Sequence, residues 1–116
     1  MKTASFFATV IFAIFLSSCQ QENVNTFTSD TFKIEIDQTG FISGLLDIET
    51  NRDYSPDETR SPILTVVDNG RLCMPISFKS VNNNEFLLGF DQTEAGVILE
   101  VVQHATHISF CIKEIK

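Results

Sequence analysis

The sequence contains no tryptophan, a single tyrosine and 11 phenylalanines among its 116 residues. Four of those phenylalanines lie in the first 15 residues, and most of the others alternate with polar residues, which places them in a protein core. Tyr54 is therefore the one aromatic side chain that we expect at the surface. Because sugar rings usually dock on flat, exposed aromatic faces, this composition argues against an autonomous carbohydrate-binding module.

A basic cluster is also missing. Eight Lys and Arg residues stand against 15 Asp and Glu residues, which gives a formal charge of −7. Phosphate backbones and anionic lipid head groups repel a chain of this charge. We therefore expect no nucleic-acid partner.

Motifs for covalent or phosphate chemistry are absent as well. The chain has no G-x-S-x-G sequence, no glycine-rich phosphate loop and no Cys/His spacing typical of a catalytic pair. His104 and His107 flank a short connection and could face each other, but a zinc site needs three or four ligands. We expect two surface histidines, no metal, no cofactor and no enzymatic activity.

No apolar run is long enough for a membrane-spanning helix, which needs about 20 residues. The run from Ala4 to Leu16 follows Met1 and Lys2, the arrangement of a secretory signal peptide. The sequence Leu16-Ser17-Ser18-Cys19 that ends it resembles the lipobox of bacterial lipoproteins, in which the cysteine is lipidated and becomes the first residue. The resemblance predicts a signal peptide over residues 1–18 and lipidation of Cys19, against the alternative of an ordinary signal peptide with a chance cysteine.

The polar segment after Cys19 shows no hydrophobic period, so residues 19–30 are predicted to be the lipidated cysteine and a flexible tether. Acyl chains would then supply the membrane contact. Gln20 differs from the aspartate that retains enterobacterial lipoproteins at the inner membrane. We therefore expect an envelope protein attached to the outer membrane, on its periplasmic or surface face.

A period of two begins at residue 31. Phe32, Ile34 and Ile36 alternate with charged residues, as in a half-buried strand. Asn69-Gly70 is a strong two-residue hairpin signal, and Pro75 indicates an edge strand or a break. Residues 31–116 are thus predicted to form an all-β domain, an antiparallel β-sandwich of about seven to eight short strands. The expected strands are 32–37, 41–48, 62–68, 71–79, 86–91, 97–104 and 107–115.

The two cysteines of this domain, Cys73 and Cys111, lie in expected strands whose neighbouring residues look core-facing. Alternation then places both thiols on outer faces. A disulfide is permitted beyond the inner membrane, but it needs adjacent strands. We expect two unpaired strand cysteines.

The longest polar loop, residues 49–61, holds the candidate ligand-binding residues Arg52, Asp53 and Tyr54. Paired carboxylates in such a loop could act on glycosidic bonds only at a suitable separation, which the sequence does not supply. A binding role centred on Tyr54 is the better expectation.

Residues 32–70 carry a recognisable arrangement of strands and turns. It consists of an alternating strand that ends in Asp, a glycine turn, a strand of the form I-x-x-L-x-D, a loop with threonine and tyrosine, and then Ser-Pro-x-Leu. The positions are Asp37, Gly40, Ile42, Leu45, Asp47, Thr50, Tyr54, Ser61, Pro62 and Leu64. This stretch resembles the galactose-mutarotase-like β-sandwich module that begins many secreted glycoside hydrolases of Bacteroidetes-type bacteria.

In such enzymes the catalytic residues lie in a downstream domain, so the resemblance transfers no catalytic residue. It implies a lipid-anchored, non-catalytic envelope module that is accessory to, or truncated from, a glycan-degrading protein. The alternative is a small envelope lipoprotein that binds a protein partner, such as an inhibitor or an assembly factor, through the acidic loop 49–61.

Overall fold

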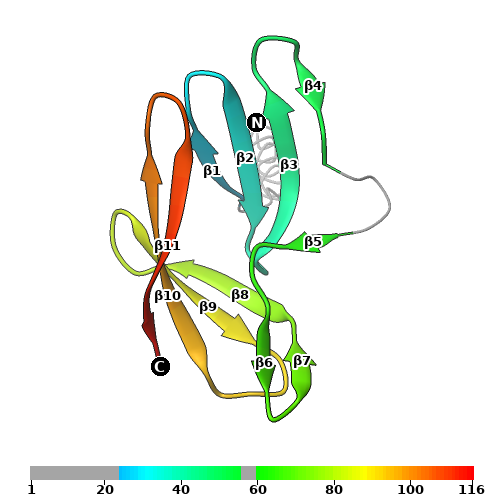
Figure 1. The fold of residues 1–116 in the computed structure, drawn as a ribbon, viewed down its shortest axis with the longest axis vertical. Coiled ribbons are helices and arrows are strands. Elements are labelled where there is room, and N and C mark those ends of the chain that lie inside the picture. Colours follow the sequence, from blue (N-terminus) through cyan, green and yellow to red (C-terminus); the bar gives the residue numbers. More distant parts are fainter. Residues whose placement is uncertain (1–23, 56–59) are drawn as a thin grey trace, which may run out of the picture.

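The structure, a computed structural model, describes residues 24–55 and 60–116 (Figure 1). These ranges form an all-β fold of antiparallel sheets, and the predicted β-sandwich class is confirmed. They contain eleven strands instead of the seven or eight expected. The increase has two sources: two expected strands are each split in two, and two short strands lie in segments that were predicted to be irregular.

The first sheet has the order β1-β2-β3-β4, with β5 also paired with β3, and every pairing is antiparallel. The alternation that predicted the strand at 32–37 holds, since Ile34 and Ile36 are buried between less buried neighbours. The strands are β1 (Val24–Thr28), β2 (Phe32–Asp37), β3 (Phe41–Asp47), β4 (Arg52–Asp53) and β5 (Ser61–Pro62).

The second sheet has the order β11-β10-β9-β8, and a separate two-stranded hairpin, β6-β7, precedes it in the chain (Figure 1). The hairpin consists of β6 (Val66–Asp68) and β7 (Arg71–Cys73). The sheet consists of β8 (Pro75–Ser80), β9 (Glu85–Phe90), β10 (Gly96–Gln103) and β11 (Ile108–Ile115).

Side chains of both sheets make up one hydrophobic core. Ile36 from β2 and Leu88 from β9 are fully buried within it. The ring of Phe86 stacks on Phe78 at 4.6 Å and meets the edge of Phe27 at 5.4 Å, which joins β9 to β8 and to β1. Each such fully buried apolar side chain contributes about 1.5–3 kcal/mol to the free energy of unfolding.

Two turns have the geometry that their sequences predict. Asn69 and Gly70 both have positive φ, 54° and 74°, as a two-residue primed hairpin requires. In the turn between β2 and β3, the Gly40 amide donates to the Asp37 carbonyl at 3.1 Å. Gly40 has φ of 94°, a conformation that an L side chain rarely adopts.

Strand β3 contains a β-bulge beside Gly44. Glu35 of β2 lies opposite Gly44, and the next residue, Ile36, lies opposite Ile42, so Ser43 is the extra residue of β3. A Cβ atom at Gly44 would be 2.6 Å from the Glu35 side-chain oxygen Oε1. A side chain at this position would displace the end of the flexible Glu35 side chain, which lies across the glycine backbone.

Pro75 also acts as predicted. It begins β8, the edge strand of the second sheet, and Met74 separates this strand from β7. Because proline has no amide hydrogen to donate, it fits the start of an edge strand. The expected strand at 71–79 is therefore two strands that belong to different sheets.

The first sheet begins inside the segment predicted to be a tether. Residues 24–28 form β1, which pairs with β2 from Val24 opposite Asp37 to Thr28 opposite Lys33. Phe27 is the only buried residue of β1, so the strand gives no period-two signal in the sequence. The predicted signal peptide and Cys19 lie outside the described residues. Within the described ranges, no helix is long and apolar enough to cross a membrane.

The outward orientation predicted for Cys73 is wrong. Its side chain is 0% exposed and belongs to the core, whereas the neighbouring Leu72 faces solvent. The reason is the short β6-β7 hairpin, in which the Val66–Cys73 pair faces inward and the Val67–Leu72 pair faces outward. Cys111 is exposed as expected, and both residues are free thiols.

Candidate functional site

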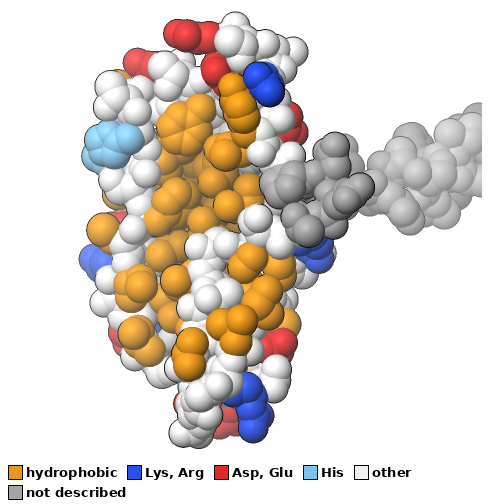
Figure 2. Space-filling view, turned by 45° about the vertical axis from the view of Figure 1, so that its right-hand side comes forward, with side chains coloured by type: hydrophobic (Ala, Val, Ile, Leu, Met, Phe, Trp, Pro, Cys, Tyr) orange, Lys and Arg blue, Asp and Glu red, His pale blue; other side chains and the backbone are white. Residues whose placement is uncertain are grey.

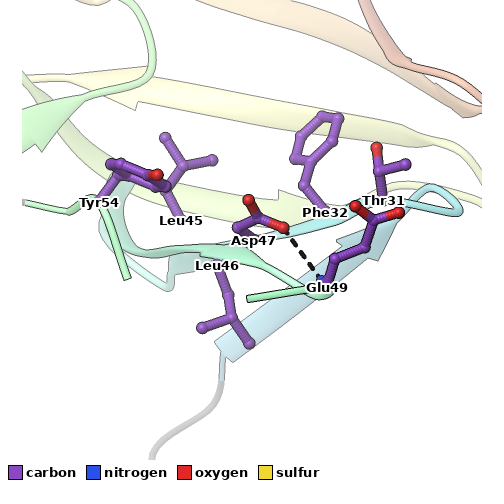
Figure 3. Close-up of a pocket in the computed structure, with 7 residues that line it drawn as sticks. All are labelled: Thr31, Phe32, Leu45, Leu46, Asp47, Glu49 and Tyr54. Carbon is purple, nitrogen blue, oxygen red and sulfur yellow. Dashed lines mark hydrogen bonds between the residues drawn. The ribbon is translucent and has the colours of Figure 1, made fainter. Parts of the chain in front are cut away.

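A cavity of about 370 Å³ lies beside Tyr54, where β2, β3 and the start of the polar loop meet (Figure 3). Residues from three consecutive segments line it, and five of the seven are polar or aromatic. The lining residues are Thr31, Phe32, Leu45, Leu46, Asp47, Glu49 and Tyr54.

The register between β2 and β3 brings the lining together. Phe32 lies directly opposite Asp47, and Leu45 lies directly opposite the buried Ile34. Directly opposite residues of an antiparallel pair share one face of the sheet. Phe32, Leu45 and Asp47 are therefore on the core-facing side, and Figure 3 shows them on one side of the ribbon while Leu46 points away.

A tight turn after β3 fixes the polar side of the cavity. The carboxylate atom Oδ1 of Asp47 accepts hydrogen bonds from the amides of Glu49 at 3.0 Å and Thr50 at 3.4 Å. The Asn51 amide donates to the Asp47 carbonyl at 2.8 Å, and Asn51 has a positive φ of 60°. These bonds hold Glu49 at the rim and leave Oδ2 of Asp47 without a hydrogen bond to the described residues.

Tyr54 forms the opposite wall. Its amide donates to the Leu45 carbonyl at 2.7 Å, which fixes the residue beside β3, while the residue remains 55% exposed. The guanidinium carbon of Arg52 lies 4.9 Å from the ring centroid. This is the geometry of a cation–π contact, so Arg52 supports the tyrosine ring without lining the cavity.

Asp53, the third predicted candidate, is directed into the local backbone. Its Oδ1 atom accepts hydrogen bonds from the Leu45 amide at 3.2 Å, the Ser55 amide at 2.9 Å and the Ser55 hydroxyl at 2.8 Å. The backbone hydrogen bond from Ser55, followed by those from its hydroxyl and from Leu45, lowers the pKa of Asp53. The structure therefore places Tyr54 at the cavity, Arg52 against Tyr54, and Asp53 in the turn that positions both.

Sequence reasoning missed the residues that complete the cavity, chiefly Thr31, Phe32, Asp47 and Glu49. The sequence predicts the β2-β3 turn, and residues at equal distances from this turn would be paired in a regular hairpin. The extra residue Ser43 shifts that pairing by one, however, and such a slip changes which residues face each other. The hydrophobic pattern alone therefore does not predict the register of the two strands, or the cavity that depends on it.

The cavity combines an apolar wall with hydrogen-bond acceptors. Phe32, Leu45 and Tyr54 supply the wall, and the carboxylates of Asp47 and Glu49 supply the acceptors. Among the described residues that line it, none is basic.

Figure 2 shows apolar side chains gathered in a broad band along one face of the molecule, with charged groups mainly at the margins.

A second cavity, of about 540 Å³, lies along the edge strand β8. Phe78, the one aromatic residue among the described residues that line it, is almost wholly buried in the core and offers no exposed ring. The remaining lining is mostly amide and hydroxyl side chains together with Lys79. The cavity beside Tyr54 is the better candidate because it presents an exposed aromatic ring.

The two histidines are exposed, as expected, and their rings face each other. The rings of His104 and His107 stack with centroids 4.2 Å apart and planes 16° apart. The His104 amide donates to the His107 carbonyl at 2.8 Å, and the connection spans four residues between β10 and β11. In the part of the chain that the structure describes, no group of three or more His, Cys, Asp or Glu side chains could hold a metal ion.

No protein-family model, curated protein or solved structure matches the chain.

Proposed function

We propose that this chain is a lipid-anchored, non-catalytic β-sandwich module of the bacterial envelope, accessory to or truncated from a glycan-degrading protein, which contacts glycan through the cavity beside Tyr54. The observation that carries the proposal is the meeting of an exposed tyrosine, an apolar wall and two carboxylates in one cavity. The strand-and-turn resemblance of residues 32–70 and the lipobox resemblance at Cys19 support it.

A sugar ring matches this cavity in chemistry. One face of the ring carries C–H groups that pack on apolar or aromatic side chains, and its rim carries hydroxyl donors. Tyr54 and Leu45 supply the apolar contact, and Asp47 supplies a free carboxylate oxygen. Since a single tyrosine and a shallow wall give limited burial, we expect a weak dissociation constant of about 0.1–1 mM.

A lipid anchor would raise the effective strength of weak glycan binding. Acyl chains on Cys19 would hold many copies at one membrane surface, where several weak contacts act together on a polymer. Substitution Cys19→Ser removes the thiol that accepts the lipid. The variant should leave the membrane fraction and lose acyl labelling; retention of both would sink the lipobox interpretation.

Binding is tested on a glycan array with residues 20–116 and with two variants of that chain. Tyr54→Ala removes the aromatic wall. His104→Ala is the matched control, because it truncates an exposed ring on the β10-β11 hairpin, outside the cavity. Glycan binding that is lost in the first variant and kept in the second supports the proposal, whereas an array without signal refutes it.

One observation favours the alternative of a protein partner. β11 is an edge strand of eight residues, and Ile112 and Ile115 on it are 53% and 70% exposed. An exposed edge strand can pair with a strand of another chain. If the glycan array is silent and Ile115→Lys abolishes capture of an envelope protein, the protein-binding function replaces the glycan function.

A further inference from the structure

We infer that the cavity beside Tyr54 selects an amino sugar whose nitrogen is a free ammonium group, held by the carboxylates of Asp47 and Glu49 while the sugar ring packs on Tyr54 and Leu45. This inference rests on the proposed glycan-binding function and specifies its ligand class. It is carried by the charge of the cavity and by the position of its apolar wall.

The charged side chains that line the cavity are both acidic. Asp47 and Glu49 belong to none of the four ion pairs found among the described residues, so neither carboxylate is in direct contact with a lysine or an arginine there. The Glu49 amide donates to Asp47 Oδ1, which keeps the two residues adjacent at one rim (Figure 3). An ammonium group offers three donors and a full positive charge to such a pair.

Arg52 lies directly opposite Asp47 in the β3-β4 pairing and so shares its face of the sheet, but the two side chains form no ion pair. The Arg52 guanidinium lies over the Tyr54 ring and does not line the cavity. The contact also shows that this ring tolerates a cation beside it. The ligand ammonium then belongs at the carboxylate rim, and the C–H face of the sugar ring belongs over Tyr54 and Leu45.

Other sugar classes fit the cavity less well. An N-acetyl group removes the positive charge, leaves one N–H donor in place of three, and adds a carbonyl oxygen that the carboxylates cannot satisfy. A uronic acid brings a carboxylate toward Asp47 and Glu49, and like charges repel. The formal charge of −7 adds a long-range field that attracts cationic ligands and repels anionic ones.

The test is calorimetric titration of residues 20–116 with three oligosaccharides of equal length: β-1,4-linked glucosamine, its N-acetylated form and a polyuronate. We expect the glucosamine oligomer to bind about fivefold more tightly than the N-acetylated one, since two exposed charge contacts contribute about 1 kcal/mol together. The advantage should shrink as salt rises.

Two isosteric variants assign the preference to the cavity. Asp47→Asn keeps an oxygen that can accept from the Glu49 and Thr50 amides, and Glu49→Gln keeps the size of the side chain. Each should reduce the preference for glucosamine to about twofold. Thermal melts of both variants report folding, and Glu49→Gln decides the test if Asp47→Asn is unfolded.

The possible outcomes distinguish failure of the ammonium inference from failure of the proposed glycan-binding function. Binding of no oligosaccharide refutes the proposed glycan function. Equal binding of the neutral and cationic oligomers overturns the ammonium inference and leaves glycan binding intact. A pentalysine peptide that binds as tightly as the glucosamine oligomer also overturns it, because the cavity would then recognise charge alone.

Discussion

At the scale of single residues, Asp37 makes the densest set of polar contacts in the first sheet. Its Oδ1 atom accepts hydrogen bonds from the Thr39 amide and hydroxyl and from the Phe41 amide, and Oδ2 accepts one from Arg60. Partial burial raises the pKa of Asp37, but the hydrogen bonds from Thr39, Phe41 and Arg60 together outweigh burial and lower it below its ordinary value. The ionised carboxylate therefore stabilises the turn that joins β2 to β3.

The substitution Asp37→Asn should lower the free energy of unfolding by about 1–2 kcal/mol at neutral pH, because it removes charge-assisted hydrogen bonds. A pKa that folding lowers contributes stability above the unfolded value of 3.8, and this contribution is lost as the pH falls through the lower folded value. Urea unfolding of both proteins from neutral to acidic pH measures this. The difference between them should vanish in acid; a difference that stays constant with pH contradicts the expectation.

The two cysteines should differ sharply in reactivity. Cys111 is exposed on β11, whereas Cys73 is 0% exposed in the core. In residues 20–116, which lack Cys19, a thiol reagent should therefore modify Cys111 in the native protein and Cys73 only as the protein unfolds. Mass spectrometry locates the adduct, and rapid native modification of Cys73 would show that the β6-β7 hairpin does not bury it.

At the scale of elements, two of the turns that join strands contain a glycine with positive φ. Gly40 and Gly70 both have positive φ, but their surroundings differ. A Cβ atom at Gly40 would lie 2.9 Å from Cβ of Pro75 and 3.0 Å from a methyl carbon of Leu88, whereas one at Gly70 would meet nothing within 4 Å. The first turn packs on the second sheet, and the second turn projects into solvent.

Alanine substitutions at these two glycines form a matched pair. Gly70→Ala adds only backbone strain and should cost about 1 kcal/mol of the free energy of unfolding. Gly40→Ala adds the same strain together with overpacking against Pro75 and Leu88, and should cost about 2–4 kcal/mol. Denaturant unfolding measures both; equal costs would mean that the β2-β3 turn does not pack against β8 and β9.

The elements that the sequence revealed are those with strong local signals. Alternation identified β2, Asn69-Gly70 identified the β6-β7 turn, and Pro75 identified the edge at β8. β1 was missed because Phe27 is its only buried residue, and it gains its place by pairing with β2. Strands of this kind depend on tertiary contacts and leave no period in the sequence.

The same contrast applies to the candidate site. Tyr54 could be found because it is the single tyrosine in a polar loop. Phe32 and Asp47 could not be joined to it, because the bulge at Ser43 sets the register that places them side by side. Cys73 was assigned to the wrong face because its strand pairs only within a short hairpin, where no third strand fixes the pattern.

At the scale of the whole molecule, the second sheet has two edges of different character. β8 begins with Pro75 and carries Lys79, and its Phe78 amide donates to the Gln38 carbonyl at 2.9 Å. These features limit pairing with another chain. β11 also carries charged residues, Lys113 and Glu114, but it contains no proline, and Ile112 and Ile115 are exposed on it. Association between molecules is therefore expected at β11.

The variant Ile115→Lys should reduce self-association at high protein concentration, because a charged side chain on an edge strand opposes pairing. Its melting temperature should change little, since Ile115 is 70% exposed. Light scattering against concentration measures association, with Val67→Lys on the β6-β7 hairpin as an exposed control. An equal effect of both variants would show that total charge, and not the β11 edge, controls association.

The cavity beside Tyr54 is the centre of the proposed function, and an NMR titration tests it most directly. Residues 20–116 labelled with ¹⁵N are titrated with the glucosamine oligosaccharide. Amide signals of Phe32, Asp47, Glu49 and Tyr54 should shift together and saturate, while those of the β11 edge stay in place. Absence of shifts, or shifts confined to β11, would contradict a glycan site at Tyr54.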